Sequence, residues 1–200
     1  SPSTRQELEA IGIKTDIHLL PNGVDLQDYA YRPEKTSKTP LIGYLGRLKK
    51  YKSVDHLLKA LPVIRKRIPD IRLLIIGDGD DRQRLETMSR QLDIDDCVEF
   101  TGYVSQQRKV DLLNALWLAV NPSSKEGWGL TVIEANSCGC PVIAADSPGL
   151  RDSVLDHQTG ILYPYGQFET LAKTAIDLVR HSERRKAMAH AARKLMRESG

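Results

Sequence analysis

The sequence has few of the features that mark a secreted or a membrane-spanning protein. Its three cysteines, Cys97, Cys138 and Cys140, give no disulfide framework, which favours a reducing compartment. No apolar run approaches the roughly 18 residues that a membrane span needs, and nothing resembles a signal peptide. We therefore expect a cytoplasmic chain.

Charge of one sign is also scarce. The 29 basic and 26 acidic side chains leave a net charge of +3, which by itself suggests no nucleic-acid partner. The five histidines are scattered without ligand or triad spacing. Cys138 and Cys140 fit a tight helix exit into a buried strand better than a metal site. We therefore expect neither a bound metal nor a nucleic acid.

What the sequence does contain is a regular alternation of short apolar runs and amphipathic helical segments. The 200 residues are 40% hydrophobic, enough for one large domain over residues 1–200. Such an alternation predicts an α/β fold, Rossmann-like, with a parallel sheet of about six strands and helices on both faces. The expected strands are 41–46, 72–77, 97–100, 116–120, 141–145 and 161–163.

The two ends of the chain predict segments that lie outside the alternation of strands and helices. Residues 1–20 predict a lead-in with a helix capped by Ser3, followed by a turn at Pro21-Asn22-Gly23, and residues 182–200 predict a C-terminal helix. Ser53 and Ser105 are the other expected helix caps. The last helix presents Met188, Ala192 and Leu195 with nothing downstream to cover them, so we expect a fragment of a longer protein.

The stretch from Glu126 to Glu134, EGWGLTVIE, lies between two predicted strands and predicts a loop followed by a short helix. Such a loop lies at the carboxyl edge of a parallel sheet, where open α/β folds bind ligands. Gly127 and Gly129 suit a turn into a helix N-terminus, which favours an anionic group. Glu126 would repel a phosphate, so we expect it to accept hydrogen bonds from neutral hydroxyls. Glu134 needs a polar partner if covered, and a vicinal diol would be one.

A second candidate loop, GRLKKYK at 46–52, follows the first predicted strand. Arg47 and Lys52 could together neutralise a diphosphate, and the two loops then imply a sugar joined to a nucleotide. Each feature alone has a simpler interpretation: a solvated basic loop, a surface acid, an ordinary helical carboxylate. Trp128 either anchors its loop or stacks on a ligand. The two loops taken together favour a binding site for a nucleotide sugar over these simpler interpretations.

Several short motifs, taken in order, resemble the C-terminal half of a retaining GT-B glycosyltransferase of family 4, and the resemblance covers nearly the whole chain. The two glutamates with seven residues between them are the most specific of these motifs. The motifs are PNGVD at 21–25, GRL at 46–48, GDG at 77–79, FTGYV at 100–104, SSKEGWGLTVIEA at 123–135, GCPVIA at 139–144 and TGIL at 159–162.

This resemblance implies specific roles. Arg47 and Lys52 would bind the diphosphate of the sugar donor, and together with Glu126, which would contact the transferred sugar, they would form the catalytic group. Glu134 would hold the ribose. Residues from two loops would complete the donor site: Gly127, Trp128, Gly129, Leu130 and Thr131 around sugar and phosphates, and Tyr103 and Val104 beside the base. The family often has paired glycines where this chain has Pro148-Gly149, and usually glutamate at Asp152, so the role of that loop stays open.

The resemblance also implies a whole enzyme of two domains, of which this chain would be the donor-binding one. A nucleoside diphosphate sugar would be its partner, the acceptor domain would precede it, and no cofactor or obligatory metal would take part. We expect the chain alone to bind donor weakly and to catalyse nothing. The whole protein could associate peripherally with the inner face of a membrane.

Three alternatives remain open at this point. A nucleotide-sugar epimerase of the same architecture is one, although the spacing of Glu126 and Glu134 favours the transferase. A dinucleotide-binding oxidoreductase domain would need a third glycine after Gly77-Asp78-Gly79, where Asp80 and Asp81 follow instead. A non-catalytic nucleotide-binding module is the third.

Overall fold

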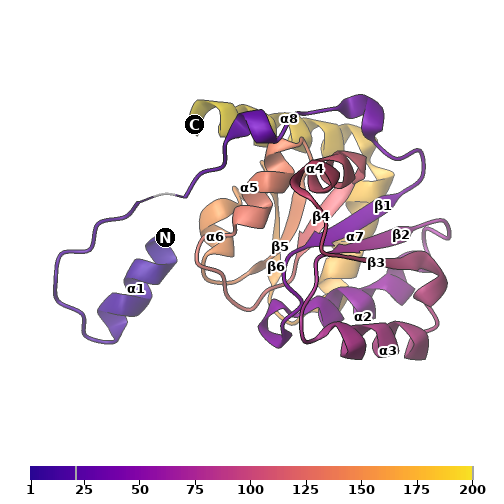
Figure 1. The fold of residues 1–200 in the computed structure, drawn as a ribbon, viewed down its shortest axis with the longest axis horizontal. Helices are drawn as coiled ribbons and strands as arrows, with labels where there is room; N and C mark the ends of the chain where they lie inside the picture. The colour runs from indigo at the N-terminus through magenta and orange to yellow at the C-terminus, as the bar shows by residue number, and fades with distance from the viewer. Residues whose placement is uncertain (21, 200) are drawn as a thin grey trace.

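The computed structural model describes residues 1–20 and 22–199, and its core is a six-stranded parallel sheet (Figure 1). The strands are β1 (Leu41–Leu45), β2 (Arg72–Ile76), β3 (Val98–Gly102), β4 (Leu118–Asn121), β5 (Val142–Asp146) and β6 (Gly160–Pro164). Every neighbouring pair is parallel. The predicted α/β architecture is therefore confirmed.

The order of the strands places two loops next to each other. The order is β3-β2-β1-β4-β5-β6, so β1 and β4 pair, with Ile42 opposite Leu118, although two strands separate them in the chain. From this pair the chain runs outwards in opposite directions. The crevice outside the carboxyl ends of the strands at such a switch point is the usual ligand site of an open α/β sheet. The loops after β1 and β4, which carry the predicted residues, meet there.

Helices cover both faces of the sheet. Figure 1 shows α2 (Val54–Arg65) and α3 (Arg82–Gln91) on one face, where α7 (Phe168–Arg180) packs against α2, and α4 (Gln106–Ala115) and α5 (Leu130–Ser137) on the other. The short helix α6 (Leu150–Ser153) follows β5. Because the central strands are covered on both faces, they are apolar almost throughout and do not alternate with polar residues.

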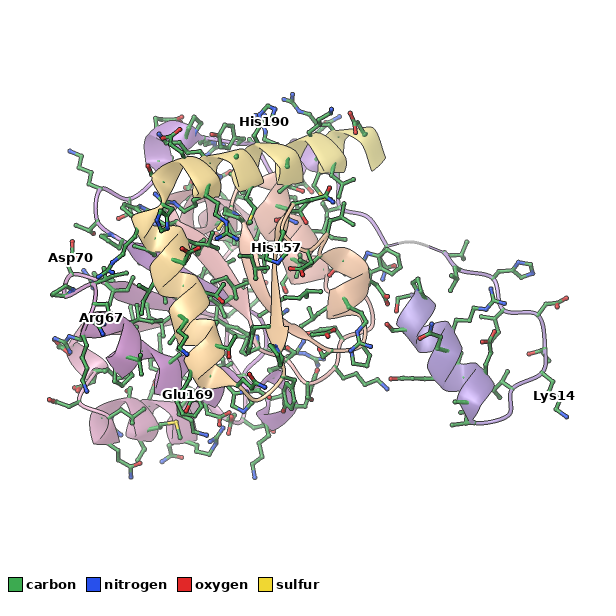
Figure 2. All side chains as sticks on the ribbon, turned by 180° about the vertical axis from the view of Figure 1, so that it is seen from behind. Lys14, Arg67, Asp70, His157, Glu169 and His190 are labelled. Atoms are coloured by element: carbon green, nitrogen blue, oxygen red, sulfur yellow. The ribbon has the colours of Figure 1, made fainter. Side chains whose placement is uncertain are left out.

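The two ends of the chain differ in how they pack against the sheet. Helix α1 (Pro2–Ala10) and the extended segment through Lys14 stand apart from the sheet (Figures 1 and 2). Helix α8 (Ser182–Ser199) instead packs back on α5 and α7, which buries Met188 and Ala192. The expectation that this apolar face lies uncovered is therefore wrong.

The predicted helix caps are partly wrong. Ser105 does cap α4, since its hydroxyl oxygen accepts a backbone N–H at 3.3 Å. Ser3 lies within α1, and Ser1 caps that helix. Ser53 is the N-cap residue of α2, as expected, but it has a left-handed backbone with φ of 51° and its side chain makes no cap hydrogen bond; its hydroxyl lies 3.0 Å from the Tyr165 hydroxyl instead. The predicted turn at 21–23 includes Pro21, which is outside the described residues.

Four one-turn 3₁₀ helices complete the described structure: η1 (Leu26–Asp28), η2 (Pro33–Lys35), η3 (Lys50–Lys52) and η4 (Asp95–Cys97). Among the helices of residues 1–20 and 22–199, none combines the length and the apolar character needed to cross a membrane. Among the four 3₁₀ helices, η3 bears on the site, because it ends the loop after β1 at Lys52.

Candidate functional site

The structure brings Glu126 and Lys52 together across the two neighbouring loops. The Lys52 ammonium lies 2.5 and 2.7 Å from the two carboxylate oxygens of Glu126. The side chains are only 11% and 14% exposed, and the hydroxyl of Ser123 donates to Glu126 Oε1 at 2.7 Å. A largely buried ion pair is better tolerated where further hydrogen bonds support it, and Ser123 supplies one here. Thus the predicted acid and the predicted cation form one unit.

The loop after β1 is held in place by its backbone. The buried Tyr44 donates its hydroxyl to the carbonyl of Arg47 at 2.9 Å, and the N–H of Ser124 donates to the carbonyl of Tyr51 at 2.9 Å. These bonds fix the Arg47 backbone and tie the loop to that of Glu126. The Arg47 side chain is exposed, and it forms no ion pair with any described residue. Its charge is therefore available to a ligand.

Glu134 belongs to a second cluster, one turn into α5. Its Oε1 accepts the hydroxyl of Tyr29 at 2.5 Å and the ammonium of Lys109 at 2.6 Å. Its Oε2 accepts no hydrogen bond from the part of the chain that the structure describes. The polar partner expected for Glu134 is thus present, and one carboxylate oxygen stays free to accept from hydroxyls of a ligand.

The charge states in this cluster follow from its contacts. Burial raises the pKa of Tyr29, and so does the hydrogen bond that it gives to Glu134. Burial acts against the Lys109 ammonium, but its hydrogen bonds to Glu134 and Tyr29 outweigh that effect, so its pKa is raised. At neutral pH the hydroxyl of Tyr29 is therefore a donor and Lys109 is charged.

A cavity of about 340 Å³ opens beside these residues, at the carboxyl ends of β1, β2 and β3. Its polar lining comes from Arg47, Asp78, Tyr103, Gln106 and Lys109, with the half-buried Val104 beside them. The volume is within the range of small-molecule sites. Three predicted residues, Arg47, Tyr103 and Val104, therefore surround one cavity, and Lys109 links that cavity to Glu134.

The glycine-rich turn predicted between the two acids is also present. Gly129 is the N-cap of α5 with φ of 83°, and a Cβ there would lie 2.7 Å from the Ser153 hydroxyl, so only glycine fits. The first N–H groups of α5, at Leu130 and Thr131, have no acceptor within the helix. With the exposed Gly127, they present backbone donors and the positive end of the helix dipole to the crevice.

Trp128 points elsewhere. It lines a different cavity, of about 220 Å³, together with Val24, Leu155, Leu195 and Met196. This apolar contact supports the role of a loop anchor, and the indole is not among the residues that line the cavity beside Arg47.

The loop at Pro148-Gly149, whose role the sequence left open, positions Glu126. The Glu126 N–H donates to the carbonyl of Pro148 at 2.9 Å. A Cβ at Gly149, where φ is 80°, would lie 2.1 Å from the Glu126 carbonyl oxygen. Nearby, the carboxylate of Asp152 accepts the N–H and the hydroxyl of Ser3, both at 3.0 Å, and so holds α1.

We therefore expect Gly149→Ala to displace Glu126. Gly166→Ala is the matched control, because Gly166 has φ of 85° but no atom within 4 Å of its added Cβ. Both variants carry the strain of a left-handed alanine, and only the first adds the clash, so Gly149→Ala should lose about 2 kcal/mol more in the free energy of unfolding. Urea titration measures both values. Equal losses would show that the close approach at Gly149 is unimportant.

Within residues 1–20 and 22–199, no group of three or more histidine, cysteine, aspartate or glutamate side chains is arranged to hold a metal ion. The three cysteines are free and buried, and burial raises the pKa of the Cys138 thiol to about 12. The charged groups described at the crevice are Lys52, Lys109, Arg47, Asp78 and the two glutamates.

Comparison with known proteins agrees with this geometry. A family model described as "Glycosyl transferases group 1" matches residues 28–195. The chain belongs to this glycosyltransferase family. It is 30% identical, over 92% of its length, to a GDP-mannose-dependent α-(1-6)-phosphatidylinositol monomannoside mannosyltransferase of Mycolicibacterium smegmatis. It is 32% identical, over 94% of its length, to a GDP-mannose-dependent α-mannosyltransferase of Mycobacterium tuberculosis.

Solved structures share the fold. Sucrose-phosphate synthase of Thermosynechococcus elongatus superposes with a TM-score of 0.92 at 25% identity, over 99% of this chain and 52% of that one. HepE of Anabaena, solved with UDP and glucose, gives 0.81 at 24% identity, over 88% of this chain and 51% of that one. The two mannosyltransferases are matched over 52% and 49% of their lengths, so this group 1 glycosyltransferase chain spans about half the length of those relatives.

Proposed function

We propose that this chain is the donor-binding half of a retaining glycosyltransferase, which moves a hexose from a nucleoside diphosphate sugar to an acceptor. The observation that carries the proposal is the pair of carboxylates, Glu126 and Glu134, each held by its own lysine at the switch point of the sheet. The helix dipole between them favours phosphate, and carboxylates accept from sugar and ribose hydroxyls.

Each cluster has capacity left for a ligand. An ammonium has three protons to donate, and Lys52 gives two to Glu126, so the third is available to a diphosphate. Arg47 adds an exposed guanidinium that can grip phosphate oxygens in a bidentate way. The free Oε2 of Glu134 faces the ribose, and Tyr103 with Val104 borders the base.

The reaction needs negative charge to be stabilised where it develops. The bond from the anomeric carbon to the diphosphate oxygen breaks and the diphosphate leaves with the electron pair. The acceptor oxygen bonds to that carbon and gives its proton to the leaving diphosphate. Arg47 and Lys52 are fixed cations at the position of the leaving diphosphate, and preorganised charge of this kind is usually the largest contribution to catalysis. We propose that no metal is obligatory and that the reaction is cytoplasmic.

The names of similar proteins support the proposal. The two mannosyltransferases are GDP-mannose-dependent, and HepE binds UDP and glucose. Because the chain spans about half of the matched relatives' length, we propose that an acceptor-binding domain completes the enzyme. One relative acts on a phosphatidylinositol mannoside, which supports peripheral membrane association of the whole protein.

Thermal unfolding with a panel of ligands tests the proposal. We expect one of GDP-mannose, UDP-glucose or ADP-glucose to stabilise the chain with EDTA present, and a ligand at about 100 times its Kd adds roughly 2.7 kcal/mol. NAD should have no effect. The chain alone should leave the sugar nucleotide unchanged, and its conversion to an epimer would contradict the proposal. Stabilisation by NAD alone would contradict the proposal.

A further inference from the structure

Another cavity, of about 250 Å³, lies between α8 and the segment that follows η1. None of its lining residues lines the cavity beside Arg47, but Tyr29 joins the two places, because it lines this cavity and its hydroxyl donates to Glu134. Its lining is Leu26, Gln27, Tyr29, Ala30, Tyr31, Ser137, Arg193, Met196 and Arg197. Two cations and no carboxylate are therefore present in this lining.

The two arginines of this cavity have no acidic partner among the described residues, whereas three other cations of α8 do; Arg185 is bonded to backbone carbonyls instead. Arg184 pairs with Asp177, Lys186 with Glu183, and Lys194 with Glu198. Neither Arg193 nor Arg197 forms an ion pair with any residue in the described part of the chain. Like charges four residues apart on a helix repel each other, so this pair is unfavourable unless an anion joins it.

Arg193 is held in one position by aromatic packing. Its guanidinium lies 4.2 Å from the centre of the Tyr31 ring. The ring also packs on the backbone at Gly139, where an added Cβ would lie 2.6 Å from a ring carbon. Burial lowers the pKa of Arg193, and the charge of Arg197 lowers it further. A stacked guanidinium keeps its edge N–H groups free to donate, which is the arrangement that phosphate oxygens need.

We propose that this cavity is a binding site for a phosphate ester, with Arg193 and Arg197 on the phosphate and with the aromatic and aliphatic lining around the rest of the molecule. The ester comes either from a small soluble molecule or from a phospholipid headgroup. The lipid source follows from the accessibility of α8 from outside. Figure 2 shows His190 on its outward side, and an adjoining hollow is lined by His190, Lys194, both arginines and Glu198, whose carboxylate pairs with Lys194.

Calorimetric titration with glycerol 3-phosphate tests the soluble source, and co-sedimentation with phosphatidylcholine vesicles containing or lacking phosphatidic acid tests the lipid source. In either assay the double variant Arg193→Gln, Arg197→Gln should bind about tenfold more weakly or worse, as expected for loss of charged hydrogen bonds. Lys186→Gln, which removes a paired cation from the same helix, should bind like the wild type.

Arg47→Gln separates this site from the donor crevice, and it should leave glycerol 3-phosphate and vesicle binding unchanged. If the double variant is too unstable to assay, Arg197→Gln alone can be used, because Arg197 is exposed. It should show part of the same loss of affinity. Three results would overturn the proposal: Arg47→Gln abolishes binding, the double α8 variant binds as well as the wild type, or the wild type binds in neither assay.

Discussion

Replacing Lys52 with methionine is expected to destabilise the chain by about 3 kcal/mol and to remove most of its affinity for a sugar nucleotide. The substitution leaves the Glu126 carboxylate with 14% exposure and no cation among its described contacts. Removing one partner of a buried pair typically costs about 3–5 kcal/mol, and we take the lower end because both side chains keep some contact with solvent. Urea unfolding and calorimetry measure the two effects.

A double-mutant cycle separates the ion pair from simple loss of packing. The variant Lys52→Met, Glu126→Gln removes both charges, and should recover most of the stability that Lys52→Met loses. Arg47→Gln is the matched comparison for binding, because Arg47 is exposed: it should weaken binding of the diphosphate without changing stability. If the stability losses of Lys52→Met and Glu126→Gln, measured singly, simply add in the double variant, the two side chains are not coupled as the structure indicates.

Replacing Glu134 with glutamine should weaken binding of a nucleoside diphosphate by roughly 2 kcal/mol, or about thirtyfold, the usual contribution of a hydrogen bond to a charged acceptor. Glutamine keeps the shape of the side chain but not the charge that Lys109 and Tyr29 hold in place. The loss should disappear when the ligand is a 2′,3′-dideoxynucleoside diphosphate, which lacks the diol that Glu134 is proposed to bind.

Glu169→Gln is the control for this prediction, since Glu169 is exposed at the start of α7, on the other side of the sheet from α4 and α5 (Figure 2). It should bind both nucleotides as the wild type does. A wild-type chain that binds ribonucleotide and dideoxynucleotide equally well would show that Glu134 does not contact the ribose.

Much of the fold could be predicted from the sequence because local signals and tertiary structure agree. The strands are short, apolar runs such as 72–76, buried on both faces, and glycines mark several of their ends. The exceptions depend on packing. The Ser53 hydroxyl makes no cap hydrogen bond, because the Ser53 backbone adopts a left-handed conformation after η3. The apolar face of α8 is covered because that helix packs back onto α5.

The site could be predicted only as far as each loop could be assigned to a strand end. Arg47, Lys52 and Glu126 lie where β1 and β4 end, so the strand order brings them together. Lys109 and Tyr29 were missed, because their contact with Glu134 depends on α4, α5 and an irregular segment meeting in space. The only sequence signal was their position, just after FTGYV and just after PNGVD.

The structure also changes the role expected of Lys52. Its ammonium already forms an ion pair with Glu126, so Lys52 is not an unpaired cation in the crevice. Under the proposed function, a diphosphate would share Lys52 with Glu126, and a sugar hydroxyl would bind the same carboxylate. Binding of the sugar and of the diphosphate are therefore expected to be linked through this one ion pair.

The most direct test of this account is the ratio of affinities for a sugar nucleotide and for the corresponding bare nucleoside diphosphate, measured by calorimetry on the wild type and on Glu126→Ala. The account predicts that the wild type prefers the sugar nucleotide by about tenfold, as a hydrogen bond to a carboxylate would give. It predicts that Glu126→Ala binds the two ligands equally, and binds the bare nucleotide at least as well as the wild type because Lys52 is released. A preference for the sugar nucleotide that survives in Glu126→Ala would contradict the account.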